Sequence, residues 1–522
     1  MSRIDLASLM LVHGVTNYPE KFGKISVLNY PFPHQSNTFK KYLKSKSLLD
    51  ASEPGTGKTF PAMLKAVLSV GLGKKVCFSM PPKVVPQFIQ ELKDYFIGYE
   101  DYYTIGTIKG TKVPEGFVFP DILVLSYDGY RSLNDSSPFK KVGKNLCNLV
   151  NGVLYTKDWR LVSKTGMAEN PNRFRLLKEG YEVYFYDEAH YLCGTDSIIS
   201  KSVKALPDSV ERHLMTGTPI PTKLENVYGL IRILSPTTYG SKANFYRNHC
   251  ILRKMEVKTG VKVEQVIGYK NVDKLHEVLF RNAVRVQKRD VIQLKEPVIT
   301  STIVSLSQSH MKLYKQIVED AFAIIDGDVV TPESGSEIRT LALRTISNPG
   351  HIPPEENELY KSLESLLDSI SPAEHKVIIF CYFKNTVRYL ARLLSKWNPS
   401  LIFGEENEIV KFKTDDSSRI AIVNWKSGGA GLNLQMASHI IFYECPTSPA
   451  DAKQAIARCD RAGQVNVVNV YFMRVIGTYL DKSFRDLLKN EETGNSVLRD
   501  KKDLLHEVLR SKLRKPTNQS GK

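Results

Sequence analysis

Disulfides, zinc-binding pairs and membrane spans are what this sequence lacks. Its 7 cysteines in 522 residues form an odd, scattered set without a C-x-x-C pair, which excludes a disulfide-built scaffold and gives no zinc site. No apolar run reaches the roughly 18 residues of a membrane span, and no signal-peptide core opens the chain. We therefore expect a soluble, intracellular protein with reduced, buried thiols, located in the cytoplasm, the nucleoid or the nucleus.

The chain is also short of acidic residues and has no internal repeat at a solenoid spacing. It has 55 Asp and Glu residues against 72 Lys and Arg residues, which gives a formal net charge of +17. Because the basic excess is spread along the chain, it favours a broad surface for a polyanion. The length predicts two or more domains, each large enough for its own core.

Residues 55–59 read GTGKT, which has the composition of a phosphate-binding loop. An apolar segment (47–51) before the loop predicts a strand, and the helical spacing of residues 60–68 predicts a helix after it. A glycine turn between a strand and a helix lets backbone amides face phosphate oxygens. The match is partial, because the full pattern has a glycine where this chain has Ser52. The predicted ATP-binding residues are Gly55, Thr56, Gly57, Lys58, which reaches the β- and γ-phosphates, and Thr59, whose hydroxyl binds Mg²⁺.

Two adjacent carboxylates follow a second apolar segment. Residues 187–190 read DEAH and come directly after the predicted buried strand 181–186. Open α/β sheets bind ligands at the carboxyl ends of their strands. We predict that Asp187 holds Mg²⁺ and that Glu188 polarises the attacking water, as phosphoryl transfer requires.

Strand-like and helix-like segments alternate twice along the chain, which predicts two parallel α/β sheets. The strand candidates are 75–80, 122–126 and 181–186 in the first alternation, and 376–381, 419–424 and 439–443 in the second. The predicted domains are an N-terminal extension (1–30), a first lobe (31–225) with an insertion at about 134–180, a mainly helical brace region (226–345), a second lobe (346–498) and a basic C-terminal tail (499–522).

With these segments in order, the chain resembles the helicases of superfamily two, and among them the Swi/Snf-type ATPases. The resemblance covers about residues 30–490 and implies two RecA-like parallel-sheet lobes with a helical insertion between them. Its most specific stretch in the first half is 224–236, LENVYGLIRILSP. The resemblance implies nucleotide recognition by Gln35, coupling of hydrolysis to domain movement by Thr216, Gly217 and Thr218, nucleotide binding by Gly431 and Gln454, and contacts with a nucleic-acid track by Lys83, Tyr127 and Asn433.

The resemblance also implies that two arginines, Arg458 and Arg461, approach the triphosphate across an interdomain cleft. Three residues apart on a predicted helix, they present fixed guanidinium groups that stabilise charge on the transferred phosphoryl group. These predicted catalytic arginines complete a set with Lys58 and Glu188.

The chain departs from the family pattern at several places. Ala457 stands at a usual glycine and Asp460 at a usual histidine, and segment 284–291 only partly matches the arginine-rich segment that braces the lobes. Segment 395–418 is shorter than usual, which puts in doubt the nucleic-acid contacts expected there. The insertion at 134–180 has no family counterpart.

These residues predict an ATP hydrolase that uses ATP and Mg²⁺ and acts on DNA, duplex or branched. We interpret it as a translocase that remodels DNA or DNA–protein complexes; its compact, motor-only layout resembles viral, phage or fork-remodelling members of the family. Three alternatives stay open: a strand-separating helicase on DNA or RNA, an ATP-timed nucleic-acid-binding switch or recruiting subunit, and a scaffold without catalysis.

Overall fold

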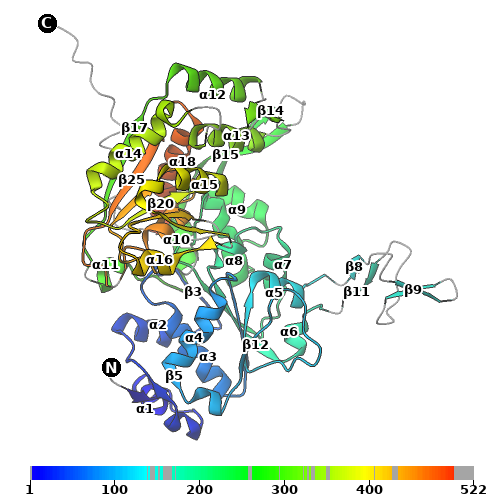
Figure 1. Cartoon of the computed structure of the whole chain (residues 1–522). Coiled ribbons are helices and arrows are strands. Elements are labelled where there is room, and N and C mark those ends of the chain that lie inside the picture. The colour runs from blue at the N-terminus through cyan, green and yellow to red at the C-terminus, as the bar shows by residue number, and fades with distance from the viewer. Residues whose placement is uncertain are drawn as a thin grey trace. The chain divides into compact units, whose positions relative to one another are not determined.

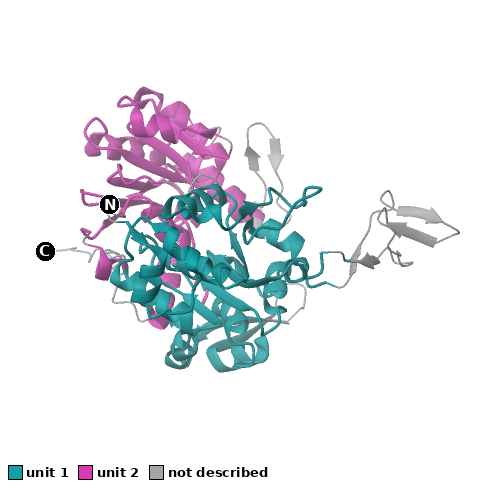
Figure 2. Ribbon diagram, turned by 90° about the horizontal axis from the view of Figure 1, so that it is seen from below, with its two compact units in different colours: residues 1–219, 225–287 teal, residues 220–224, 288–522 magenta. Residues whose placement is uncertain are grey.

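The computed structural model forms two compact units, unit 1 (Met1–Pro219 and Glu225–Gln287) and unit 2 (Ile220–Leu224 and Lys288–Lys522) (Figure 2). None of the helices in the described part of the chain is long and apolar enough to cross a membrane. The residues described are 3–498 except for 138, 142–146, 151–152, 157–166, 171, 257–261, 293, 321–322, 326–327, 331–334, 349–352, 405, 426–432 and 462. The predicted basic tail (499–522) therefore lies outside the described residues.

Unit 1 is built on a seven-stranded sheet in which every pairing is parallel. Its central strands are nearly continuous runs of buried residues, as parallel strands covered on both faces require. In spatial order the strands are β16 (Ala283–Val284), β3 (Ser47–Asp50), β13 (Glu211–Met215), β12 (Tyr181–Asp187), β4 (Lys75–Met80), β7 (Ile122–Ser126) and β6 (Ile105–Thr107).

Helices cover both faces of this sheet (Figure 1). The helix after the glycine loop begins at Thr59 and keeps Pro61 in its first turn, where a missing backbone donor costs nothing. On one face lie α2 (Pro33–Lys44), α3 (Thr59–Gly71) and α4 (Val85–Tyr95); on the other lie α5 (Tyr127–Leu133), α6 (Arg175–Lys178) and α7 (Ile198–Lys204), and α8 (Val227–Leu234), α9 (Lys242–His249) and α10 (Val272–Phe280) follow later in the chain.

The predicted N-terminal extension is packed into the hydrophobic core of unit 1. Its strands β1 (Ile4–Asp5) and β2 (Ser26–Val27) form a small antiparallel sheet with β5 (Phe96–Ile97). Helix α1 (Leu6–Val12) and the 3-10 turn η1 (Glu20–Lys24) complete the segment. The Phe22 ring is fully buried and packs so closely on Gly71 that a Cβ there would lie 2.4 Å from it.

The described parts of the insertion at 134–180 contain two separate antiparallel pairs. One joins β8 (Phe139–Lys141) to β11 (Met167–Glu169), and the other joins β9 (Cys147–Val150) to β10 (Val153–Thr156). These strands are not part of the main sheet of unit 1.

Unit 2 contains a second seven-stranded sheet, parallel except for its edge pair β21–β22. The two parallel sheets with their helices confirm the predicted α/β fold of two RecA-like lobes. The strands, in spatial order, are β17 (Val298–Val304), β25 (Asn469–Val475), β24 (His439–Phe442), β20 (Val377–Cys381), β23 (Ile420–Asn424), β21 (Ser400–Phe403) and β22 (Glu406–Asn407). The helices are α11 (Lys288–Val291), α12 (Gln308–Asp320), α13 (Gly335–Ser347), α14 (Glu358–Ile370), α15 (Lys384–Leu393), α16 (Ile409–Thr414), α17 (Pro449–Ile456) and α18 (Tyr479–Leu498).

The region 226–345, predicted to be mainly helical, contains both helices and strands, and it is divided between the two units at Gln287. It also supplies one strand to each main sheet, β16 to the first and β17 to the second. Both strands are short or partly exposed, so neither gives the apolar run that would reveal it in the sequence. Further strands in this region form the hairpins β14 (Cys250–Glu256) with β15 (Lys262–Tyr269) and β18 (Ala323–Ile325) with β19 (Asp328–Val330).

A buried charge cluster lies where β13 begins, at the amino ends of the parallel strands of unit 1. The Glu211 carboxylate lies 2.8 Å from the ammonium groups of both Lys65 and Lys74, and 3.4 Å from Nε2 of His213. Burial alone would raise the pKa of Glu211, but its contacts with His213 and the two lysines outweigh burial and lower that pKa.

We expect Glu211→Gln to lower the free energy of unfolding by about 2 kcal/mol near neutral pH, because Lys65 loses its buried counter-charge. Since the folded pKa of Glu211 lies below its ordinary 4.5, the wild-type advantage is present above that pH and shrinks as the pH falls below it. Urea unfolding of both proteins, followed by circular dichroism across this range, measures the difference. An advantage independent of pH would contradict the ion-pair explanation.

Candidate nucleotide site

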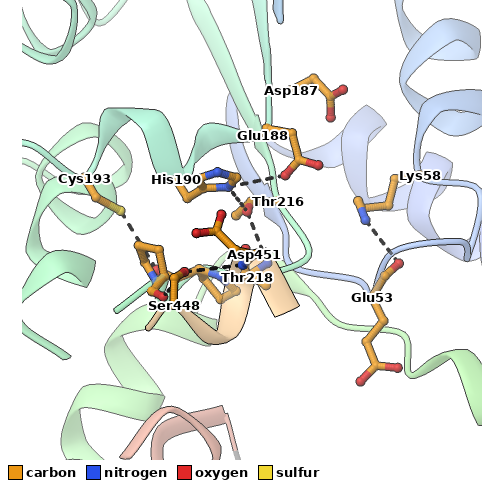
Figure 3. Close-up of polar contacts among 12 residues, drawn as sticks. Glu53, Lys58, Asp187, Glu188, His190, Cys193, Thr216, Thr218, Ser448 and Asp451 are labelled. Carbon is orange, nitrogen blue, oxygen red and sulfur yellow. Dashed lines mark hydrogen bonds and ion pairs between the residues drawn. The ribbon is translucent and has the colours of Figure 1, made fainter. Parts of the chain in front are cut away.

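The glycine loop forms the turn that the sequence predicts between β3 and α3. Gly55 and Gly57 adopt positive φ angles of 87° and 78°, a conformation that favours glycine. Lys58 precedes the first residue of α3, and its ammonium group donates to the carbonyl of Ser52 at 2.8 Å. It also donates to the carbonyl of Glu53 at 3.1 Å (Figure 3). The lysine is thus held inside the loop by backbone oxygens, at the helix N-terminus where a phosphate binds best.

The first turn of α2 holds the same loop from the other side. The Gln35 amide donates to the carbonyl of Gly57 at 3.1 Å, and its oxygen accepts from the backbone of Phe32 at 2.9 Å. His34 Nε2 lies 2.8 Å from the carbonyl of Thr56. A Cβ on Gly57 would approach the Gln35 amide nitrogen to 2.4 Å. The structure therefore brings Gln35 directly against the loop, and its role in nucleotide recognition stays a prediction.

Ser52, which departs from the usual glycine, has a structural role. Its side chain is buried and its hydroxyl accepts from the backbone of Val286 at 3.1 Å. Beside it, Arg285 Nη1 donates to the carbonyl of Ala51 at 2.6 Å. The serine hydroxyl at this position thus connects the start of the glycine loop to the segment that follows β16.

The two acidic residues lie where predicted, at the carboxyl end of β12. Burial and the neighbouring Glu188 raise the pKa of Asp187 to about 7, although Lys58 opposes this shift. Glu188 has φ 52° and ψ 48°, a left-handed conformation that is unusual for a residue other than glycine. The sharp backbone turn ends the strand.

The residues predicted to couple hydrolysis to movement are connected to this acidic pair through His190 and pack on the glycine loop. His190 Nδ1 lies 3.3 Å from the Glu188 carboxylate and 3.2 Å from the Thr216 hydroxyl (Figure 3). The Thr216 hydroxyl also accepts from the backbone of Thr218 at 3.2 Å. A Cβ on Gly217 would lie 2.6 Å from Pro54, so that the two loops pack backbone against ring.

In unit 2, Gln454 lies on α17, but the arginines do not lie on a helix as predicted. Helix α17 ends at Ile456, and Arg458 and Arg461 follow in a series of turns. The Arg458 carbonyl accepts from the backbone of Leu434 at 3.1 Å, which fixes this turn against the segment carrying Asn433. Gly431 lies outside the described residues.

Two of the departures from the family pattern contact each other. The Lys288 ammonium, in the segment that only partly matches the arginine-rich brace, forms an ion pair with Asp460. It also donates to the Asp460 carbonyl at 2.6 Å. The side chains are 14% and 9% exposed, so the pair is largely removed from water. This pair holds the backbone between Arg458 and Arg461.

We expect Lys288→Met to lower the free energy of unfolding by about 3 kcal/mol, because a buried carboxylate loses its partner. Lys288→Met combined with Asp460→Asn should regain part of this loss. Urea unfolding of the two variants and of Asp460→Asn alone measures the coupling. Strictly additive losses would show that the ion pair contributes nothing.

The three residues predicted on the nucleic-acid track differ in environment. Lys83 and Asn433 are exposed, whereas Tyr127 is partly buried and its hydroxyl bonds to the carbonyl of Asp187.

Three residues of the site, His34, His190 and Arg285, were not predicted from the sequence. His190 is the last residue of the DEAH motif, so the motif could have revealed it. No sequence motif marks His34 or Arg285 as residues that contact the glycine loop or the residues directly before it.

Two family models match the chain. Residues 162–349 match the SNF2-related domain, and residues 358–463 match the helicase conserved C-terminal domain. One solved structure that matches the chain is the Sulfolobus solfataricus SWI2/SNF2 ATPase core in complex with dsDNA. It is 17% identical, with a TM-score of 0.37 over 91% of this chain and 98% of that one.

Curated relatives are similar over different shares of their length. The uncharacterized ATP-dependent helicase YqhH of Bacillus subtilis is 22% identical over 92% of this chain and 81% of its own. The putative ATP-dependent helicase/translocase YwqA of the same organism is 24% identical over 63% of this chain, and the human DNA annealing helicase and endonuclease ZRANB3 is 24% identical over 63%. The match spans only 36% of YwqA and 31% of ZRANB3.

Proposed function

The chain belongs to the Swi/Snf-type ATPases of helicase superfamily two, and we propose that this ATP hydrolase is a translocase on duplex or branched DNA. The observation that carries the proposal is the partly buried carboxylate pair of Asp187 and Glu188, connected through His190 and Thr216 to a loop packed on the glycine loop. This network joins the hydrolytic residues to the segment predicted to couple hydrolysis to movement.

Each residue of the site has a proposed task. Lys58 binds the β- and γ-phosphates after exchanging the carbonyls of Ser52 and Glu53 for phosphate oxygens. Glu188 accepts a proton from the attacking water. Gln35 recognises the nucleotide while it holds the loop. Arg458 and Arg461 remain predicted triphosphate contacts.

The residues also fit a magnesium ion. Asp187 is a partly buried carboxylate with a pKa raised to about 7, and a nearby cation favours the charged form of such a group. Mg²⁺ is commonly held by one or two carboxylates together with substrate phosphates. Asp187 and the Thr59 hydroxyl would hold it, and the ion would supply neutralisation of phosphate charge.

DNA is the proposed polymer because both the net charge of the chain and the names of its matched relatives favour it. The net charge of +17 suits a phosphate backbone, and the matched relatives include a chromatin-remodelling factor and a DNA annealing helicase. Contacts mainly with phosphates would make binding tolerant of sequence and sensitive to salt.

Steady-state ATPase assays with Mg²⁺ test this function. The protein is assayed alone and with duplex DNA, branched DNA, single-stranded DNA or RNA. Stimulation by duplex or branched DNA is expected, together with displacement of a triplex strand. Stimulation by single strands or RNA alone would favour the strand-separating helicase instead. Nucleotide-dependent binding without displacement would favour the switch.

A further inference from the structure

Tyr127 lies beside the acidic pair because of strand register. Strand β4 pairs with both β7 and β12, so that Ser126 and Tyr186 lie against consecutive residues of β4. Tyr127 and Asp187 are each the next residue along. The Ser126 hydroxyl caps the helix that follows, accepting from the backbone of Gly129 at 3.1 Å, which fixes where Tyr127 begins α5.

The Tyr127 hydroxyl donates to the carbonyl of Asp187 at 2.6 Å. That carbonyl belongs to the peptide that leads into Glu188, the residue with left-handed backbone angles. On the other side of Glu188, its own carbonyl accepts from the backbone of Tyr191 at 3.1 Å. The unusual turn is therefore held from both sides, and a strained residue at a functional position persists only where its surroundings hold it.

The ring of Tyr127 is fixed as well. Its centroid lies 5.4 Å from that of Tyr191, whose ring stacks on His190 at 4.8 Å. His190 in turn contacts the Glu188 carboxylate. Burial, and then the charges of Asp187 and Glu188, raise the pKa of Tyr127 well above its ordinary value, so the hydroxyl keeps the proton that it donates.

We propose that Tyr127 is a positioning residue for Glu188: its hydroxyl holds the peptide that leads into Glu188 and thereby aims the carboxylate at the attacking water. This inference rests on the proposed role of Glu188. It gives the Tyr127 hydroxyl a task in hydrolysis, in contrast to the nucleic-acid contact predicted from the sequence.

Tyr127→Phe tests the inference, since it removes one hydroxyl and keeps the ring. We expect kcat for ATP to fall roughly three- to tenfold, as for one lost hydrogen bond, with KM for ATP and the Kd for duplex DNA unchanged. In a Glu188→Gln background the same substitution should cause no further loss of kcat, because it acts through Glu188.

Tyr130→Phe is the matched control on the same helix. Its hydroxyl lies 2.9 Å from that of Tyr186 and accepts from Asn134 at 2.7 Å, and neither contact involves Asp187 or Glu188. It should alter stability but leave kcat unchanged. An equal fall in kcat for Tyr130→Phe would overturn the inference, because loosening of α5 would then explain both.

The remaining outcomes separate this inference from the proposed function. If Tyr127→Phe weakens DNA binding while kcat at saturating DNA is unchanged, Tyr127 is a track contact and the inference is wrong. If Glu188→Gln loses turnover while Tyr127→Phe keeps full kcat, only the inference fails. If Glu188→Gln itself keeps turnover, the proposed assignment of water activation fails with it.

Discussion

Lys58→Ala should reduce ATP turnover by at least about a hundredfold, because no other described side chain of the glycine loop brings a cation to the phosphates. In the structure the Lys58 ammonium lies between the carbonyls of Ser52 and Glu53, and both are released when phosphate oxygens replace them. Turnover is measured by phosphate release at saturating ATP and DNA. DNA binding in a filter or gel assay should stay nearly intact.

Two further variants make this result specific. Lys40→Ala, an exposed lysine on α2, should keep its turnover. Lys58→Arg retains the charge but replaces a compact ammonium by a planar, wider group. The space between the two backbone carbonyls is too small for a guanidinium group. We expect Lys58→Arg to lose most of its activity too. Undiminished turnover in Lys58→Ala would sink the assignment of the phosphate site.

The parts of the site that could be predicted are those whose chemistry is contiguous in the chain. The glycine loop and the DEAH stretch are short motifs placed directly after apolar strands, and the structure has both at the carboxyl ends of parallel strands. A parallel sheet aligns those ends at one edge, so a strand prediction is enough to bring the motifs together.

The parts that could not be predicted depend on pairs of residues far apart in the chain. The contact that gives Ser52 its role is with Val286, 234 residues away, and the Lys288–Asp460 pair spans 172 residues. In the sequence, Ser52 and Asp460 are departures from a pattern. Only the fold shows the residue that each of them contacts.

The helix predicted to carry Arg458 and Arg461 ends before them because of tertiary contacts. Residues 454–461 have helical spacing of the arginines, yet the α17 hydrogen-bond ladder ends before them. The Gln464 side chain donates to the carbonyls of Gln435 and Ala437, both at 2.9 Å. These tertiary contacts hold Arg458 and Arg461 in a turn, and they override the helix propensity of the segment.

Glu188→Gln should bind ATP but hydrolyse it about 10²- to 10⁴-fold more slowly, because an amide cannot accept the proton of the attacking water. The substitution keeps the size of the side chain and leaves the main-chain bonds around Glu188 unchanged, so the site should keep its shape. Nucleotide affinity is expected to be retained, and addition of ATP should hold the protein in a long-lived DNA complex. Single-turnover kinetics and the dissociation rate from DNA measure these two effects.

Glu182→Gln supplies the control, since Glu182 is an exposed carboxylate on the same strand, β12. It should hydrolyse ATP at the wild-type rate. Normal turnover by Glu188→Gln would move water activation to another group. Loss of ATP binding would instead mean that the Glu188 carboxylate holds the nucleotide site together through His190 and Thr216. Retained binding with stalled chemistry is the result that the carboxylate pair predicts, because Asp187 and Lys58 would still hold the triphosphate while the water lacks its base.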